Sequence, residues 1–374
     1  MKKLLILTAS TGAGHNQAAN SLSQAFMEKG YYVNKYDFLK EGDKFLNILV
    51  AEGYDFLAKS FPKVYGNIYK LSDHKTLNDR LLKKYPRRLE NRLLTFIQES
   101  KPDIIIGTHP LSVAVIGKLK EKEIIDIPFI SIVTDFKAHY AYIDNNVDAY
   151  ITASEYTKTT LMDRDVPEDK VFSFGIPVKK EFYATPKEIK EESNFSILMM
   201  SGSMGLKGIG SVLKELTNNK NKLKVTVVCG NNKELFDDLN DKYLPYYGMG
   251  ELNILGFTNE VPKLMSESDI IISKPGGLTV SEALICKLPL IIPFAIPGQE
   301  EENSEFLVNA GAAISMDDID NLNEIIDKLI ESPDIIKRMK ENIEKISGTN
   351  SIDEIIDLAD KIIDNRSCKV NSLC

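Results

Sequence analysis

The chain has 374 residues, 43% of them apolar, which is enough to bury two hydrophobic cores. Its four cysteines form no CxxC pair, which argues against a disulfide framework or a zinc site and favours a reducing cytoplasm. The net charge of −8 argues against general nucleic-acid binding, and no apolar run approaches the 18 residues of a membrane span. The charge is uneven, however: residues 1–100 carry +6 and the remainder −14, so the first quarter suits an anionic surface.

The first 177 residues predict a doubly wound parallel sheet. A short apolar strand over residues 2–8 is followed by a glycine turn, a helix after Gly14 and a second strand in "YYVNKYDF". The runs "PDIIIGTHP", "IPFISIVTD" and "VDAYITAS" then repeat the pattern of a buried strand that ends in polar residues. We expect one α/β domain over residues 1–177.

Residues 43–100 interrupt this pattern and predict a helical insertion in the first domain. The segment supplies no clear strand, and it mixes aromatic residues and leucines with the basic cluster "KKYPRR", which contains Lys83, Lys84, Arg87 and Arg88. Two interpretations stay open: a helical excursion with a solvated basic face, or a surface that meets anionic lipid.

A second α/β domain is expected over residues 194–347. The strands "NFSILMMSGS", "LKVTVVCGNN", "LNILGFT", "SDIIISKPGG" and "LPLIIPF" each end in glycine or small polar residues before a helix. The Pro-bearing, charged residues 178–193 form the expected linker. Residues 348–374 predict an amphipathic terminal helix followed by a frayed tail, "RSCKVNSLC".

The loop "STGAGHNQAA" contains Gly12, Gly14 and His15 at the start of the first predicted helix. It has neither the third glycine of a dinucleotide fingerprint nor the Lys-Ser/Thr of a P-loop, so both nucleotide interpretations fail. The positive end of the helix dipole favours a neutral imidazole at His15, which is the form that a general base needs. The alternative is that His15 only caps the turn.

The richest candidate site lies in the second domain, in "SKPGGLTVSEAL" and "PGQEEEN". Glycines between a strand and a helix let backbone N–H groups bind a diphosphate, and a carboxylate one turn along can accept hydrogen bonds from ribose. Amide and carboxylate groups after the next strand are of the kind that recognises sugar hydroxyls. The residues are Gly276, Gly277 and Glu282 in the first motif, and Gln299, Glu300 and Asn303 in the second.

Other strand ends supply supporting residues. In the second domain, Gly202 and Ser203 suit phosphates, while Phe257 and Thr258 suit a base that stacks on the ring. In the first domain three polar side chains follow strands and are expected to position an acceptor: His109, Asp135 and His139. The spacing of His15, His109 and His139 matches no local metal motif.

Together, "LTASTGAGHNQAAN", "THPLS", "VTDF", "SKPGGLTVSEAL" and "PGQEEEN" resemble the monogalactosyldiacylglycerol synthase and processive diacylglycerol glucosyltransferase family, which belongs to glycosyltransferase family 28. The match keeps the motif order over nearly the whole chain. The resemblance implies the GT-B fold, with two Rossmann-like domains facing across a cleft. It also implies that a hexose is transferred with inversion from a UDP-sugar to diacylglycerol at the inner face of the cell membrane.

The same resemblance implies residue roles. His15 would be the general base in an acceptor loop with Gly12 and Gly14. The "GGLTVSE" element would bind diphosphate and ribose, the "QEEEN" element the hexose, and Phe257 with Thr258 the uracil. No obligatory metal or cofactor is implied. The family's loop often has a basic residue directly after the histidine, where this chain has Asn16.

Three alternatives remain open. One is N-acetylglucosaminyl transfer to a lipid-linked cell-wall precursor, by an enzyme with a similar glycine–histidine loop but a different sugar loop. Another is a UDP-N-acetylglucosamine 2-epimerase, which shares the fold and needs no acceptor. The third is a nucleotide-sugar sensor without catalysis. Glucose is preferred over galactose as the donor sugar because the chain resembles the processive glucosyl branch.

Overall fold

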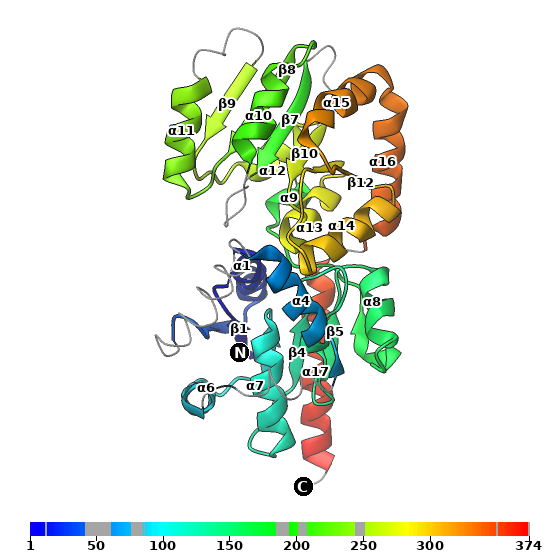
Figure 1. Cartoon of the computed structure of the whole chain (residues 1–374). Helices are drawn as coiled ribbons and strands as arrows, with labels where there is room; N and C mark the ends of the chain where they lie inside the picture. Colours follow the sequence, from blue (N-terminus) through cyan, green and yellow to red (C-terminus); the bar gives the residue numbers. More distant parts are fainter. Residues whose placement is uncertain are drawn as a thin grey trace. The chain divides into compact units, whose positions relative to one another are not determined.

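The computed structural model describes most of the chain, in nine stretches: residues 1–11, 13–41, 61–75, 85, 87–184, 194–200, 208–243, 251–348 and 351–372. The chain divides into two compact units (Figure 1). The first unit contains Met1–Lys179, Pro297–Gln299 and Gly348–Cys374, and the second contains Lys180–Ile296 and Glu300–Ser347.

The first unit is built on a six-stranded parallel sheet in the order β2-β1-β3-β4-β5-β6. Its strands are β1 (Lys3–Thr8), β2 (Tyr32–Asp37), β3 (Ile104–Gly107), β4 (Phe129–Ile132), β5 (Ala149–Ile151) and β6 (Val171–Phe172). Thr8 pairs with Asp37 and Leu7 with Gly107, so these three strands end at the same edge. The strand order reverses between β1 and β3, and an open α/β sheet binds its ligands at the carboxyl ends beside such a point.

Helices cover both faces of this sheet, because alternate residues of each buried strand point to opposite sides. Leu5 and Leu7 belong to one buried cluster, while Leu4 and Ile6 belong to the other. The helical elements are α1 (Ala13–Glu28), α4 (Pro62–Ser72), α6 (Arg87–Ser100), α7 (Pro110–Glu121), η2 (Tyr140–Tyr142), α8 (Glu155–Met162) and η3 (Glu168–Lys170). The described part of the predicted helical insertion consists of α4 and α6.

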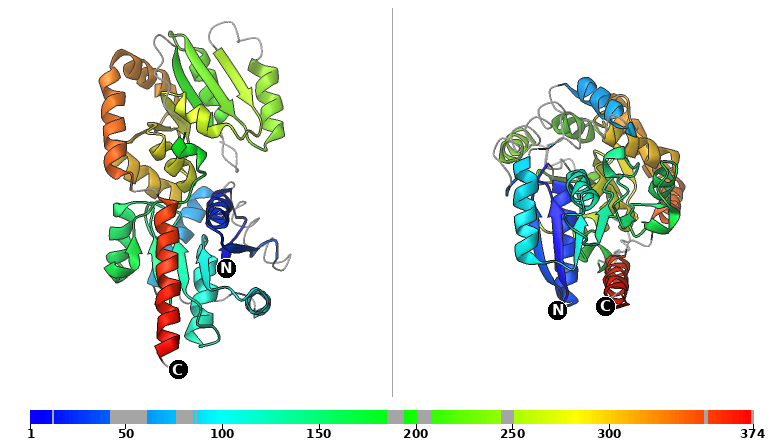
Figure 2. Two further views of the ribbon diagram at one scale, coloured as in Figure 1. Left: turned by 180° about the vertical axis from the view of Figure 1, so that it is seen from behind. Right: turned by 90° about the horizontal axis from the view of Figure 1, so that it is seen from below.

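The C-terminal helix α17 (Ile352–Ser372) packs on the first unit, where Figure 2 shows it as the long red helix. Its buried residues Ile355, Ile356, Ala359 and Ile363 join the cluster of Leu4 and Ile6. Asp360 accepts hydrogen bonds from Lys2 Nζ at 2.5 Å and from Tyr31 Oη at 2.6 Å. The helix continues to Ser372, further than the frayed tail expected from the sequence.

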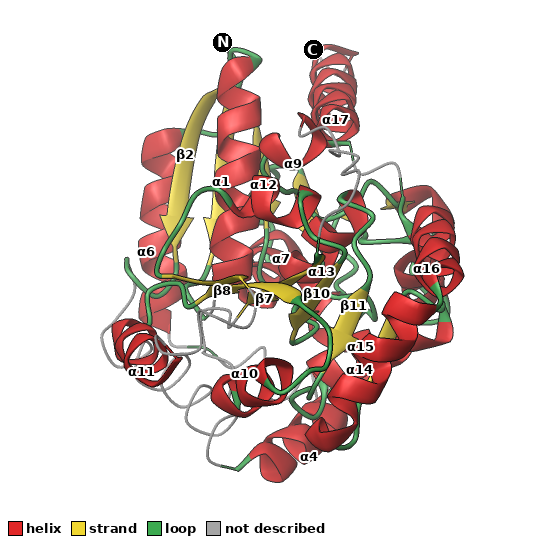
Figure 3. Cartoon of the chain, turned by 90° about the horizontal axis from the view of Figure 1, so that it is seen from above, coloured by secondary structure: helices red, strands yellow, loops and turns green. Residues whose placement is uncertain are grey.

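The second unit repeats the design with a parallel sheet in the order β12-β11-β10-β7-β8-β9. Its strands, yellow in Figure 3, are β7 (Phe195–Met200), β8 (Leu223–Val228), β9 (Glu251–Leu255), β10 (Ile270–Ser273), β11 (Leu290–Ile292) and β12 (Ala313–Ser315). The order reverses between β7 and β10. The sequence prediction of two doubly wound α/β domains is confirmed, although the short strands β6 and β12 were not predicted.

The helices of the second unit follow its strands in the expected alternation. They are α9 (Glu181–Ala184), α10 (Ile209–Thr217), α11 (Lys233–Tyr243), α12 (Val261–Ser266), α13 (Gly277–Ile285), α14 (Gln299–Asn309), η5 (Ile319–Asn321), α15 (Leu322–Glu331) and α16 (Pro333–Ile346). The predicted linker begins in the first unit and includes α9, and its residues 185–193 lie outside the described part of the chain.

Candidate active site

His15 lies in the first turn of α1 and contacts the end of the neighbouring strand β3. Its Nδ1 atom is 2.7 Å from the carbonyl oxygen of Thr108, and the Thr108 hydroxyl donates to the His15 carbonyl at 3.1 Å. The Thr108 N–H donates in turn to the Leu7 carbonyl at 2.9 Å. These bonds hold the imidazole against the carboxyl ends of β1 and β3.

The contact with Thr108 determines which nitrogen of His15 carries the proton. A carbonyl oxygen can only accept, so Nδ1 is the protonated nitrogen and Nε2 keeps its lone pair. Burial lowers the pKa of His15, and the bond to the Thr108 carbonyl offsets only part of that effect. Near neutral pH the ring is therefore neutral, with a free basic nitrogen.

Thr134 contacts the same nitrogen of His15, and Tyr142 in turn holds Thr134. Thr134 follows β4, and its Oγ1 atom lies 3.2 Å from His15 Nδ1 and 2.8 Å from the hydroxyl of Tyr142. Both side chains are buried. Neither residue is predicted from the sequence; the only signal for Thr134 is its place in "VTDF", next to Asp135.

His109 touches His15 and has the opposite tautomer. The two rings meet edge to face with centroids 4.6 Å apart. His109 caps α7, where its Nδ1 accepts from the Leu111 N–H at 3.0 Å, so Nε2 carries the proton. Burial, and then the neighbouring His15, hold the pKa of His109 well below its ordinary value. The contact places His15 and His109 side by side at the carboxyl ends of β1 and β3, and their expected roles toward the acceptor stay predictions.

His139 has a structural position. Its Nδ1 accepts from the Ala141 N–H at 3.0 Å, and its Nε2 lies 3.3 Å from the Tyr69 carbonyl and 3.2 Å from Ser72 Oγ. The side chain is buried and packs on the Tyr69 ring of α4. Both nitrogens thus contact the protein, and the expected acceptor contact of His139 stays a prediction.

The loop between β1 and α1 is held by a polar network that the sequence pattern does not predict. Asn16 Nδ2 donates to Ser10 Oγ at 2.7 Å, and Thr8 Oγ1 donates to Asn16 Oδ1 at 3.1 Å. Ser10 also bonds to the carboxylate of Asp37 through its hydroxyl and, at 3.2 Å, through its N–H. Asn16, which follows the histidine, therefore fastens the loop. Gly14 lies inside α1, and Gly12 lies outside the described residues.

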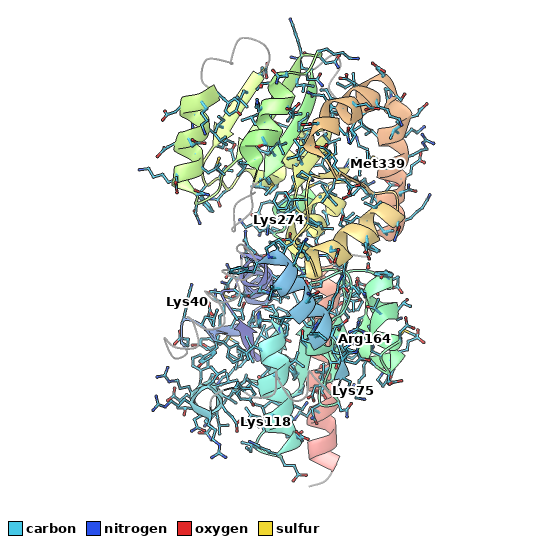
Figure 4. All side chains as sticks on the ribbon, in the orientation of Figure 1. Lys40, Lys75, Lys118, Arg164, Lys274 and Met339 are labelled. Atoms are coloured by element: carbon cyan, nitrogen blue, oxygen red, sulfur yellow. The ribbon has the colours of Figure 1, made fainter. Side chains whose placement is uncertain are left out.

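In the second unit, two motifs far apart in the sequence come together. Gly276 caps α13 and Gly277 is its first residue, directly after β10 ends at Ser273. Lys274 Nζ bonds to Glu300 Oε1 at 2.7 Å, and Asn303 Nδ2 donates to the Pro275 carbonyl at 3.0 Å. The start of α14 is thus fastened to the loop before α13; Figure 4 labels Lys274. Lys274 is not among the site residues predicted from the sequence.

The remaining residues of these motifs are also placed. Glu282 is buried one turn into α13. The second carboxylate oxygen of Glu300 accepts from the Ile296 N–H at 3.1 Å, so Glu300 has a clear structural function besides any contact with sugar. Gln299 groups with the first unit and donates from Nε2 to Asp135 Oδ1.

Phe257 and Thr258 follow the carboxyl end of β9. The Phe257 side chain is 67% exposed, which is unusual for a large aromatic residue and leaves its ring available for stacking. Thr258 Oγ1 accepts from the Glu260 N–H at 3.1 Å and so shapes the turn. The phosphate candidates Gly202 and Ser203 lie outside the described residues.

The basic cluster is described only in part. Lys83 and Lys84 lie outside the described residues, whereas Arg87 and Arg88 begin α6 and are exposed. Within the described part of the chain, no three His, Cys, Asp or Glu side chains gather as ligands for a metal ion. None of the helices described there has the length and apolar character needed to cross a bilayer.

The fold matches those of several solved structures. MurG of Acinetobacter baumannii superposes with a TM-score of 0.67 at 17% identity, over 96% of this chain and 100% of MurG. The UDP-GlcNAc 2-epimerase of Neisseria meningitidis gives a TM-score of 0.57 at 16% identity, over 96% of this chain and 99% of the epimerase. At such low identity these matches show the fold alone. The fold is GT-B, which confirms the prediction from the sequence.

Sequence comparisons add the family. A model of monogalactosyldiacylglycerol (MGDG) synthase matches residues 15–178, and a model of the glycosyltransferase family 28 C-terminal domain matches residues 196–358. The processive diacylglycerol β-glucosyltransferase of Bacillus subtilis is 31% identical over 95% of this chain and 94% of its own length. The protein of the same name from Bacillus pumilus is 30% identical over 98% of this chain and 97% of its own length. The chain therefore belongs to the MGDG synthase family of glycosyltransferases and is a glycosyltransferase, as predicted.

Proposed function

We propose that the protein transfers a hexose, glucose in our assignment, from a UDP-sugar to the hydroxyl of diacylglycerol with inversion at the anomeric carbon, and that it can repeat the transfer on its product. The observation that supports this proposal most is the extent of the similarity to the processive diacylglycerol β-glucosyltransferases, which covers 95% or more of the chain. The alternative enzymes share its fold, but at 17% identity or less.

His15 is the proposed general base. The bond to the Thr108 carbonyl leaves Nε2 unprotonated, and burial keeps the ring neutral. In the proposed step Nε2 takes the proton of the diacylglycerol hydroxyl while that oxygen attacks the anomeric carbon. The bond from the anomeric carbon to UDP breaks on the opposite face, so the β-linked product forms by inversion. Gly12, Gly14, His109, Asp135 and His139 are proposed to line the acceptor side.

The second unit is the proposed donor site. Gly276 and Gly277 at the start of α13 offer backbone N–H groups to the diphosphate, where negative charge grows as UDP leaves. Glu282 is proposed to bind the ribose and Phe257 to stack on uracil with Thr258 beside its edge. Gln299, Glu300 and Asn303 are proposed to hold the hexose, and Gly202 with Ser203 to contact the phosphates.

The acceptor implies a location. Diacylglycerol resides in the membrane, so we propose that the protein works in the cytoplasm on the inner face of the cell membrane. Arg87 and Arg88 are exposed at the start of α6, and together with Lys83 and Lys84 they are proposed to meet anionic headgroups. Each basic residue near such a surface is worth about 1 kcal/mol.

Product analysis tests the proposal. The protein is incubated with UDP-glucose, UDP-galactose or UDP-N-acetylglucosamine, with and without diacylglycerol vesicles, and both lipids and nucleotide sugars are separated. We expect glycolipids with one or more glucose residues only when UDP-glucose and diacylglycerol are both present. A new UDP-sugar without lipid would indicate an epimerase instead. Binding of UDP-glucose without any turnover would indicate a sensor.

A further inference from the structure

Helix α4 has an outer face of exposed apolar side chains. Phe61 at its N-cap is 51% exposed, and Val64, Ile68 and Leu71 are 48%, 49% and 59% exposed. Residues at this three- and four-residue spacing lie on one side of a helix. We call these four residues the apolar stripe. Apolar residues scattered singly on a surface need no explanation, whereas a contiguous apolar patch of a few hundred Å² is often functional.

The inner face of α4 is firmly attached to the first unit, so the stripe is the outer side of the helix. Tyr65 is buried, and Gly66 packs so tightly on Pro297 that an added Cβ would lie 2.6 Å from the proline Cβ. Beyond the helix, Asp73 forms a two-fold ion pair with Arg164 at 2.5 and 2.8 Å; Figure 4 labels Arg164. This attachment holds the stripe in place.

The charges beside the stripe favour one class of partner. Lys63, Lys70 and Lys75 are exposed on the same short segment, and its acidic residue, Asp73, is half-buried and paired with Arg164. A helix with lysines beside a row of large apolar residues suits the interface of an anionic bilayer. Four half-exposed side chains offer on the order of 300 to 400 Å² of apolar surface. A stable protein interface buries ~800 Å² on each partner, so the stripe is well below the size that such an interface needs.

We infer that α4 is an interfacial helix that lays its apolar stripe, Phe61, Val64, Ile68 and Leu71, into the surface of an anionic lipid bilayer. This inference rests on the proposed function, since it supplies the contact with the membrane that holds the acceptor. It assigns an apolar part of that contact to α4, in addition to the charge proposed for Lys83, Lys84, Arg87 and Arg88.

A fluorescence experiment tests the inference, because the natural chain contains no tryptophan. Leu71→Trp places a single reporter on the stripe, and Ile124→Trp places the matched reporter at another exposed apolar position of the first unit, 45% exposed. Both proteins are mixed with phosphatidylglycerol–phosphatidylcholine vesicles. We expect a blue shift of the emission at position 71 and none at position 124. The absence of a shift at position 71 would overturn the inference.

The tryptophan emission measured without vesicles shows whether something other than lipid covers the stripe. A blue-shifted spectrum at position 71 that depends on protein concentration would indicate a second copy of the chain. One that is blue-shifted at every concentration would indicate cover by the chain's own residues. Either result would overturn the inference.

Vesicle flotation gives a second readout that does not depend on the reporter. We expect the double variant Ile68→Asn/Leu71→Asn to bind vesicles with a partition coefficient at least tenfold lower than that of wild type. The matched double variant Ile124→Asn/Met162→Asn should keep the wild-type partition coefficient. Lys63→Gln/Lys70→Gln should weaken binding about fivefold for each charge, and only to anionic vesicles. Equal binding of the stripe variant and wild type would contradict the inference.

The inference and the proposed function fail in different ways. If the protein does not glycosylate diacylglycerol, the shift at position 71 can still occur, and then only the proposed function is wrong. If glycolipid forms normally without that shift or any loss on flotation, only the inference is wrong.

Discussion

His15 and Thr108 hold each other through two hydrogen bonds, from His15 Nδ1 to the Thr108 carbonyl at 2.7 Å and from the Thr108 hydroxyl to the His15 carbonyl at 3.1 Å. The residues are 93 positions apart in the sequence, and the pairing of β1 with β3 brings them together. One consequence is chemical, because Nε2 is left as the free base. The other is geometric, because the ring cannot rotate without breaking the bond to a strand end.

The neutral state of His15 predicts the pH dependence of turnover. Burial lowers the pKa of His15 below the ordinary value of 6.5, so the base stays unprotonated at pH values where an exposed histidine is charged. We expect the acid limb of the kcat/KM profile to have its midpoint below pH 6.5. A midpoint at or above 6.5 would contradict the assignment of this limb to His15.

Thr134 is predicted to position His15. Its hydroxyl lies between His15 Nδ1 and the Tyr142 hydroxyl. Loss of one such hydrogen bond costs about 0.5–1.5 kcal/mol, so Thr134→Val should lower kcat about 2- to 10-fold and move the acid limb of the pH profile. Thr134→Ser keeps the hydroxyl and should restore both. A Val variant with lower stability but an unmoved pH profile would make Thr134 purely structural.

Phe257 is predicted to bind the base of the donor. Stacking on an aromatic ring is worth about 1–3 kcal/mol per base, so Phe257→Ala should weaken UDP binding about 5- to 100-fold by calorimetry. The melting temperature should hardly change, because the ring is 67% exposed. Phe257→Tyr keeps a stacking surface and serves as the control. UDP affinity that is equal in the Ala variant and wild type would remove Phe257 from the donor site.

The C-terminal helix is predicted to stabilise the first unit. Ile355 is fully buried against the sheet, so Ile355→Ala should lower the free energy of unfolding by about 2–5 kcal/mol. Ile362 lies on the same helix and is only partly buried, so the same change there should cost clearly less. Urea unfolding measures both. Equal small losses would mean that α17 packs only loosely on the sheet.

Local patterns in the sequence predict much of the fold. The apolar runs that end in glycine or small polar residues predict ten of the twelve described strands, and Ser273 ends β10 where "SDIIISKPGG" indicates. The strands β6 and β12 are two and three residues long, too short for a periodic signal. Nor does the sequence predict that α17 packs on the first unit, because packing between distant segments leaves no local pattern.

In the candidate site too, local motifs predict individual residues but not the contacts between distant segments. Motifs indicate His15, Gly276 and Glu282, because each stands at a fixed distance from a strand end. The bond of His15 to Thr108 and that of Lys274 to Glu300 join segments 93 and 26 residues apart, which spacing alone does not predict. His109 and His139 follow strands as expected, but each caps a helix through Nδ1. A histidine after a strand is therefore ambiguous until its nitrogens are placed.

The turnover of His15→Ala with UDP-glucose and diacylglycerol vesicles, measured beside its affinity for UDP, tests the central claim most directly. The exposed His74, which has no part in the proposed chemistry, supplies the matched control, His74→Ala. Loss of a general base predicts a kcat at least about 100-fold lower for His15→Ala, with UDP affinity and the control unchanged. Near-normal turnover, or a loss of UDP affinity as large as the loss of turnover, would contradict the role of His15 as the base.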